Sequence, residues 1–299
     1  MRRKRTWIAI LLSVLLVLPL LKGCRQKTPE EWLAEAQANM ANLESVHTDL
    51  TVQLDMGAMG KSMCLEVHMA ADAVLEPTVA RMEMSVKMGG MSAKMPLYFE
   101  QKDGTVMAYM GMDTGIETIW YRQSVETAPF NYDLMSDASL IEFQFIEEEE
   151  EEIWSGSPLV FHDGQGEEKQ LRYRGLIDAK LLKGMISFSG NGGLIGGESE
   201  EIEDVFEQIG SLEMIITVDP ASGYIVRMEM DMGPMMRMAM QQVIESSGIT
   251  EEDWETGKAW ARMPIVIEYS RFNEIETIEI PEEALEGTLI EEEQSGISA

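Results

Sequence analysis

The sequence predicts an α+β protein in which a long antiparallel sheet with one apolar face is covered by amphipathic helices. Three consecutive segments, 46–56, 63–73 and 80–88, alternate apolar and polar side chains with a period of two, the pattern of half-buried strands. Short turn signals join these segments, which favours antiparallel pairing of neighbours. Segments with helical periodicity flank this run. Because a sheet must cover its apolar face, we expect these helices to pack against it.

The composition argues against one class of partner. The chain has 299 residues, 45% of them hydrophobic, which is enough for one large domain with a real core. Its formal net charge is −30, and the sequence forms no basic patch. A nucleic-acid partner is not expected, because phosphate binding needs clustered lysine or arginine.

The N-terminus has the layout of a secretory signal. The cationic stretch MRRKR precedes a largely apolar run, 7–21, that is shorter than the ~20 residues of a membrane-spanning helix. The next residues, LKGC, resemble the lipobox of bacterial lipoproteins, although Lys22 stands where that motif has a small or uncharged residue. The resemblance implies a diacylglyceryl group on Cys24, which would anchor the chain to the outer face of the bacterial cell membrane. The other interpretation is an uncleaved signal anchor.

These signals set the expected organisation of the chain. We expect a signal peptide at 1–23, a lipidated linker at 24–27, a single domain at 28–284 and a polar tail at 285–299. If Cys24 is acylated, Cys64 has no partner for a disulfide. No base stands out near Cys64 in the sequence, so we expect an unreactive strand residue there.

The expected domain opens with a helix and continues with strands. Thr28 suits the helix cap, Pro29 its first position, and Glu31 can close a capping box with Thr28. After this helix the apolar positions recur every second residue in each segment, and Asp103 with Gly104 predicts a tight hairpin turn.

The apolar positions of the strands are the candidate lining of a ligand cavity. They alternate with charged or polar residues, so each strand offers one apolar face. The candidate lining residues are Leu50, Val52, Leu54, Val67, Met69, Met82, Met84, Val86, Met228, Met230 and Met232.

The rest of the chain mixes helix and strand signals. Helices are expected at 132–146, around 178–185, at 200–209 and from Pro234 to before Gly248, and strands at 171–177, 212–218, 224–232, 263–272 and 276–280. The acidic run Glu147 to Glu152 is typical of a solvated helix face or loop, because a calcium loop mixes Asp, Asn and Gly at fixed offsets.

Three motifs carry a resemblance to a known group. They are YFEQKDGTVMAYM with the downstream IWYR, the hairpin VDPASGYIVRMEMDM, and the closing YSRFNEIETIEIPEEA. In this order, and together with a lipobox, they resemble bacterial lipoproteins with a LolA/LppX-like fold, many of them Gram-positive proteins without assigned function. The resemblance covers about 28–284. It implies an open, curved antiparallel half-barrel with helices on its concave face, where better-studied relatives bind lipid or acyl chains.

Three functions fit these observations, and an apolar-ligand carrier fits best. The first is a membrane-anchored module that binds a lipid or acyl chain between sheet and helices. The second is a ligand-free interaction or sensor module of the cell envelope. The third is a Cu(I)-binding protein, because 227–240, RMEMDMGPMMRMAM, holds seven methionines in fourteen positions.

The spacing of the methionines in 227–240 changes at Gly233, from the period of a strand to the period of a helix. Those before it line one face of a strand, and those after it line one stripe of a helix, so we interpret them as pliable apolar lining. No metal ligand set or cofactor is expected. The sequence holds no G-x-S-x-G, H-E-x-x-H or C-x-x-C motif, so we expect no enzyme and no catalytic residues.

Overall fold

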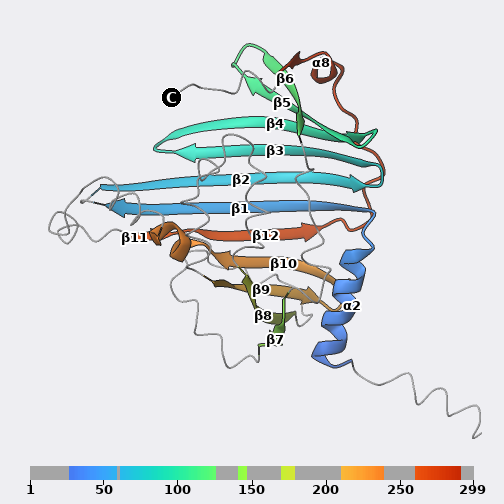
Figure 1. Ribbon diagram of the computed structural model, residues 1–299, viewed down its shortest axis with the longest axis vertical. Coiled ribbons are helices and arrows are strands. Elements are labelled where there is room, and N and C mark those ends of the chain that lie inside the picture. The colour runs from blue at the N-terminus through green and yellow to red at the C-terminus, as the bar shows by residue number, and fades with distance from the viewer. Residues whose placement is uncertain are drawn as a thin grey trace, which may run out of the picture.

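One open sheet dominates the structure, a computed structural model that describes residues 27–58, 61–125, 141–146, 170–178, 210–238 and 260–290. The described strands follow the order β13-β6-β5-β4-β3-β2-β1-β12-β10-β9-β8-β7, and β11 also pairs with β1 (Figure 1). All pairs are antiparallel except β13 with β6. Since β7 and β13 stand at opposite ends of the order, the sheet is not closed. The predicted fold class, an α+β protein built on an open, curved antiparallel sheet, is confirmed.

The first six strands form a meander. Their bounds are Ser45–Ala58 for β1, Lys61–Leu75 for β2, Thr78–Met88 for β3, Met91–Lys102 for β4, Thr105–Asp113 for β5 and Thr118–Val125 for β6. Each pairs with the next, and the predicted Asp103-Gly104 turn joins β4 to β5 with positive φ at both residues. The end strands are rotated strongly relative to the central ones, which gives the sheet its curvature (Figure 1).

The later strands extend the sheet from the other side of β1, except β13, which pairs with β6 at the opposite edge. Their bounds are Phe143–Phe145 for β7, Leu171–Asp178 for β8, Ser211–Asp219 for β9, Tyr224–Asp231 for β10, Trp260–Arg262 for β11, Pro264–Ser270 for β12 and Thr288–Leu289 for β13. Segments that are far apart in the sequence therefore pair at the centre of the sheet, where β12 lies between β1 and β10.

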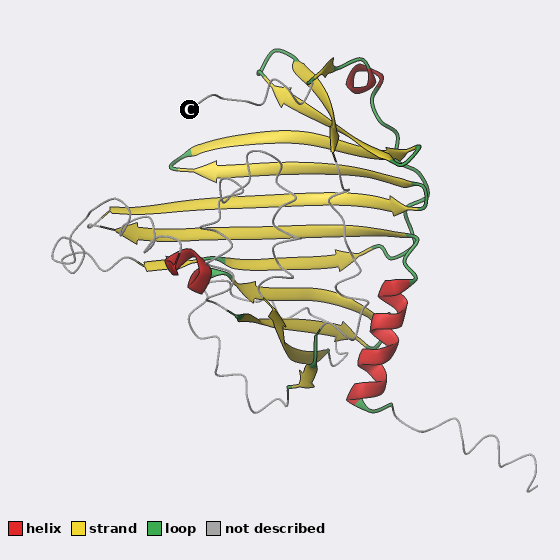
Figure 2. Cartoon of the chain, in the orientation of Figure 1, coloured by secondary structure: helices red, strands yellow, loops and turns green. Residues whose placement is uncertain are grey.

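Few helices accompany the sheet in the described part of the chain (Figure 2). The helix α2, Pro29–Ala41, begins with the predicted capping box of Thr28 and Glu31, and it packs on β9 and β10. Residues 233–238 are helical, as expected for a helix opening near Pro234. The short helix α8 spans Glu282–Leu285. Among the described residues, none of the helices is long and apolar enough to cross a membrane.

One predicted helix is wrong at its C-terminal end. We expected a helix over 132–146, but Phe143–Phe145 form β7 and pair with β8. The reason is visible in the local sequence, because Phe143 and Phe145 alternate with Glu142 and Gln144 at the period of a strand. Phe145 meets Tyr173 edge-on, with ring centroids 5.6 Å apart. The earlier residues of that helix lie outside the described chain.

The C-terminal segment also differs from expectation. The predicted strand at 276–280 joins no ladder, because this segment runs across the strand ends toward α8 (Figure 1). Ordered structure then continues past residue 284, where we expected the domain to end, since Thr288 and Leu289 pair with Tyr121 and Arg122. The helix expected around 178–185 is wrong at its first residue, because Asp178 ends β8, and its other residues lie outside the described chain. The helix expected at 200–209, the run Glu147 to Glu152 and Cys24 also lie outside the described residues.

Candidate functional site

Cross-strand register aligns the apolar side chains into continuous rows. Leu50 on β1 lies directly opposite Met69 on β2 and Ile267 on β12, and the same matching continues outward in both directions. One row is Tyr173, Ile216, Met228, Ile267, Leu50, Met69, Met84 and Met95. The next row is Met214, Met230, Ile265, Val52, Val67 and Val86. We call the surface that carries both rows the apolar face.

The apolar face includes the predicted lining residues. Ten of the eleven lie in β1, β2, β3 and β10 with their side chains on this face, as their register shows. The eleventh, Met232, follows the end of β10 and packs in the same hydrophobic cluster. The structure thus brings the predicted residues together on one surface, but it divides them by burial.

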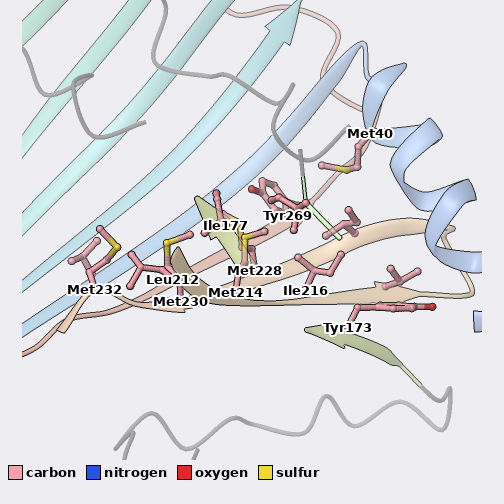
Figure 3. Close-up of a cluster of buried hydrophobic side chains, with 14 of the residues drawn as sticks. Met40, Tyr173, Ile177, Leu212, Met214, Ile216, Met228, Met230, Met232 and Tyr269 are labelled. Carbon is pink, nitrogen blue, oxygen red and sulfur yellow. The ribbon is translucent and has the colours of Figure 1, made fainter. Parts of the chain in front are cut away.

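The half of the face over β8, β9 and β10 is closed by the protein's own packing (Figure 3). Met228 and Met230 are 1% and 3% exposed, and Met214 and Ile216 are fully buried. Met40 of α2 belongs to the same cluster. These methionines are core residues, and we call this region the closed half.

A buried tyrosine joins α2 to the closed half. The Tyr173 hydroxyl donates a hydrogen bond of 2.6 Å to the backbone carbonyl of Pro29, the first residue of the helix. Burial, with the nearby carboxylate of Glu30, raises the pKa of Tyr173 to about 12. The hydroxyl therefore stays protonated and keeps donating across the physiological range.

The other half of the face, over β12 and β1 to β4, is only partly covered. We call it the open half. Its half-buried side chains are Leu50, Leu65, Met69, Met84, Val86, Met95, Leu97, Ile265 and Ile267. On the same face they alternate with buried residues, since Val52, Leu54, Val67 and Met82 are only 3–8% exposed. An apolar surface of this kind can accept a hydrophobic guest without displacing the closed half.

Some residues of the apolar face were not among the predicted lining. Ile265 and Ile267 of β12 occupy the centre of the open half, between β1 and β10. Their alternation was visible in the sequence, but the position of β12 beside β1 was not. Met95 was also missed, although it pairs directly with Met84.

The opposite face of the sheet is charged and cross-linked by ion pairs. Glu229, 6% exposed, contacts Arg227 at 2.6 Å and Arg172 at 3.4 Å, and Arg227 also reaches Glu268. This chemistry leaves the apolar face as the surface on which an apolar ligand would sit. No group of three or more His, Cys, Asp or Glu suited to a metal ion occurs within the described ranges.

Asp72 is the centre of the charged face beside β1. Its carboxylate accepts from His47 Nδ1 at 2.7 Å, Arg81 at 2.7 Å and Arg271 at 3.2 Å, although it is only 7% exposed. Burial opposes the ionisation of this carboxyl. The hydrogen bond from His47 and the charges of His47, Arg81 and Arg271 outweigh that cost and hold the pKa of Asp72 below its usual value. His47 also contacts Asp49, which lies 3.5 Å from His68.

Cys64 lies on the same charged face and is exposed and free. A hydrogen bond with Asp55, followed by desolvation and the charges of Asp55 and Glu66, raises the pKa of its thiol. A raised pKa lowers the thiolate fraction at neutral pH, which agrees with the expectation of an unreactive strand residue.

Comparisons with known proteins add limited information. The model of a family of unknown function, DUF6612, matches residues 28–130, about a third of the chain. None of the curated proteins matches. A solved structure, LprF from Mycobacterium bovis, is similar at 14% sequence identity with a TM-score of 0.40, over 85% of this chain and 96% of that one. The fold assignment rests on the strand order and register described above.

The Asp72 cluster makes a testable prediction about stability. Asp72→Asn should lower the free energy of unfolding at pH 7 by about 1–3 kcal/mol, because it weakens charge-assisted hydrogen bonds in a largely buried position. A carboxylate with a lowered pKa in the folded state stabilises it above the unfolded pKa, so this difference should shrink as the pH falls below about 4.

Urea denaturation of both proteins between pH 3 and pH 8 measures this difference. The matched control is Glu66→Gln, which breaks an exposed ion pair with Lys87 and should cost less than about 1 kcal/mol. A cost for Asp72→Asn no larger than the control, or one independent of pH, would contradict the account.

Proposed function

We propose that this protein is a membrane-anchored extracytoplasmic lipoprotein that binds an apolar ligand, a lipid or acyl chain, on the open half of the apolar face. The observation that carries the proposal is the partial burial of this half. Leu50, Met69 and Met84 stand in one row with intermediate exposure, whereas Met228 in the same row is 1% exposed. Large, partly exposed apolar side chains that adjoin one another are typical of an interaction or ligand-binding surface.

The dimensions of the open half suit an acyl chain. It crosses five strands, from β12 to β4, and a strand spacing of about 4.8 Å makes it ~19 Å wide. One leaflet of a bilayer has a hydrocarbon thickness of about 15 Å, half of the ~30 Å core. A single acyl chain laid along a cross-strand row would therefore find apolar contacts over most of its length.

The side chains of this surface suit the binding of several acyl chains more than the selection of a single one. Met69, Met84 and Met95 are unbranched and flexible, so they can repack around chains of different length. Each methylene moved from water to such a surface contributes about 0.8 kcal/mol, which supplies affinity without polar contacts. The absence of recognised catalytic motifs in the sequence supports binding, not catalysis.

The expected anchor would hold the domain near lipid. Three residues lie between Cys24 and Thr28, so an extended linker spans at most ~14 Å between these two residues. The helix α2 begins at the next residue and packs directly on the sheet. A lipid group on Cys24 would thus keep the domain within a short distance of the membrane surface, where acyl chains are available.

Polar substitution in the open half should weaken lipid binding. Met69→Gln combined with Met84→Gln should reduce affinity for a fluorescent fatty acid about tenfold, because two apolar contacts of about 0.7 kcal/mol each are lost. Displacement titration measures the affinity, and native mass spectrometry of the wild type should show co-purifying lipid.

The matched control is Lys87→Gln, which lies on the opposite face of the strand that carries Met84. It should bind like the wild type. A wild-type protein that carries no lipid and takes none from vesicles would contradict the proposal and favour a ligand-free interaction or sensor module.

Removal of the modified thiol tests the anchor separately. Cys24→Ser should move the protein from the membrane fraction to the soluble fraction if the diacylglyceryl group is the main attachment and the signal peptide is still cleaved. Membrane fractionation measures where the variant is found, and its intact mass shows whether the lipid and the signal peptide are present. An unchanged membrane fraction would favour an uncleaved signal anchor and would leave the ligand-binding proposal standing.

A further inference from the structure

Two neighbouring hairpin turns carry the same methionine pattern. Residues 56–63 read MGAMGKSM and residues 88–95 read MGGMSAKM, so each has methionines at the first, fourth and eighth positions with glycine second. The first segment connects β1 to β2 and the second connects β3 to β4. The strand ends that these two segments join lie at the same end of the sheet, on adjacent hairpins (Figure 1).

Register brings three of these thioethers onto one patch of the apolar face. Met88 lies directly opposite Met91 across the β3–β4 turn, and on its other side it faces Leu65 of β2. Met63 is two residues from Leu65, so it occupies the diagonal position to Met88 on the same face. Directly paired positions have Cβ atoms about 5 Å apart and diagonal ones about 7–8 Å, within reach of long side chains.

The turn fixes the Met88–Met91 pair in advance. Gly89 and Gly90 form its two central residues with φ of +56° and +86°, values that L side chains rarely adopt. A two-residue turn of this type leaves no slack, so the two methionines must face each other. Met63 is placed by a long ladder, since β2 pairs with β1 from Lys61 onward.

These three methionines are exposed, as is Met112, whereas most other methionines of the described residues are buried or half-buried. Met63, Met88 and Met91 have 42%, 41% and 68% of their surface accessible. The cluster at 228–232, which first suggested metal chemistry, is buried at 0–3% exposure. The burial of Met228, Met230 and Met232 removes them as accessible ligands, and the exposure of the turn methionines supplies others.

We propose that Met63, Met88 and Met91 form a binding site for Cu(I). Thioether sulfur is a neutral, soft ligand, and soft ligands select Cu(I) over hard divalent cations. Lys87 and Lys94, on the strands that carry Met88 and Met91, lie on the other face in ion pairs with Glu66 and Glu83. The net charge of −30 raises the local concentration of cations around the protein.

This site is independent of the apolar-ligand proposal. It lies at the turn end of the face, whereas the proposed lipid surface is centred on Leu50, Met69 and Met84. Cys64 is the nearest competing soft ligand in sequence, but it projects from the opposite face, where it pairs with Asp55. Its thiol must be removed in any test, because a thiolate would bind Cu(I) on its own.

The test uses the full chain in detergent with Cys24→Ser and Cys64→Ser, so that thioethers are the only sulfur ligands. Methionine methyl groups are labelled with ¹³C, and Ag(I) serves as a redox-inert probe. We expect saturable binding of one Ag(I), with shifts of the Met63, Met88 and Met91 methyl signals. Anaerobic competition with bicinchoninate then measures Cu(I) affinity.

The triple variant Met63→Leu, Met88→Leu and Met91→Leu should lower Cu(I) affinity at least about tenfold, because leucine keeps the volume of methionine without its sulfur. The matched control is Met112→Leu, an exposed methionine, 54% accessible, near the end of β5. It should bind Cu(I) like the parent. Undiminished affinity in the triple variant, or equal Ag(I) shifts at Met112, would overturn the proposal.

Discussion

The continuity of the apolar face depends on strand register. Side chains alternate between faces along a strand, so a slip of one residue in any hairpin would turn that strand's apolar residues toward solvent. Tight turns prevent such slips. Gly89 and Gly90 close one hairpin and Asp103 with Gly104 closes another, all four with positive φ. With these turns fixed, the matching begun at Leu50 extends across the sheet to Met95 on one side and Tyr173 on the other.

The same register places the charged residues opposite the apolar face. Asp72 stands between His47 on β1 and Arg81 on β3 because these three are direct cross-strand neighbours. Ion pairs connect neighbouring strands of the meander on the charged face, while the opposite face of the sheet remains apolar. At the edge of the meander, Asn273 accepts from the backbone N–H groups of Glu44 and Ser45 and so ties the start of β1 to the segment after β12.

Much of this arrangement could be predicted from the sequence. Period-two alternation identified β1 to β3, and the capping box identified the start of α2, because both patterns are local. The strand at Phe143–Phe145 was predicted as a helix, since three residues carry too weak a periodic signal beside an apolar run that also fits a helix. The pairing of Thr288 and Leu289 with β6 has no local pattern at all.

The division of the apolar face into two halves could not be predicted. It depends on contacts between residues far apart in sequence, such as the hydrogen bond from Tyr173 to Pro29 and the packing of α2 on β9 and β10. Met228 and Met84 look alike in their strands, each alternating with charged residues. The strand of Met228, β10, packs against α2 and Met228 is buried, whereas Met84 lies on β3 and is half-buried.

The most direct test of the account is a methyl NMR titration with a nitroxide-labelled fatty acid. A bound nitroxide broadens nearby methyl signals, and the methionines of the two halves report separately. The account predicts strong broadening at Met69, Met84 and Met95 with little at Met214 and Met228. No broadening, or equal broadening of both sets, would contradict the claim that the apolar face has one open half and one closed half.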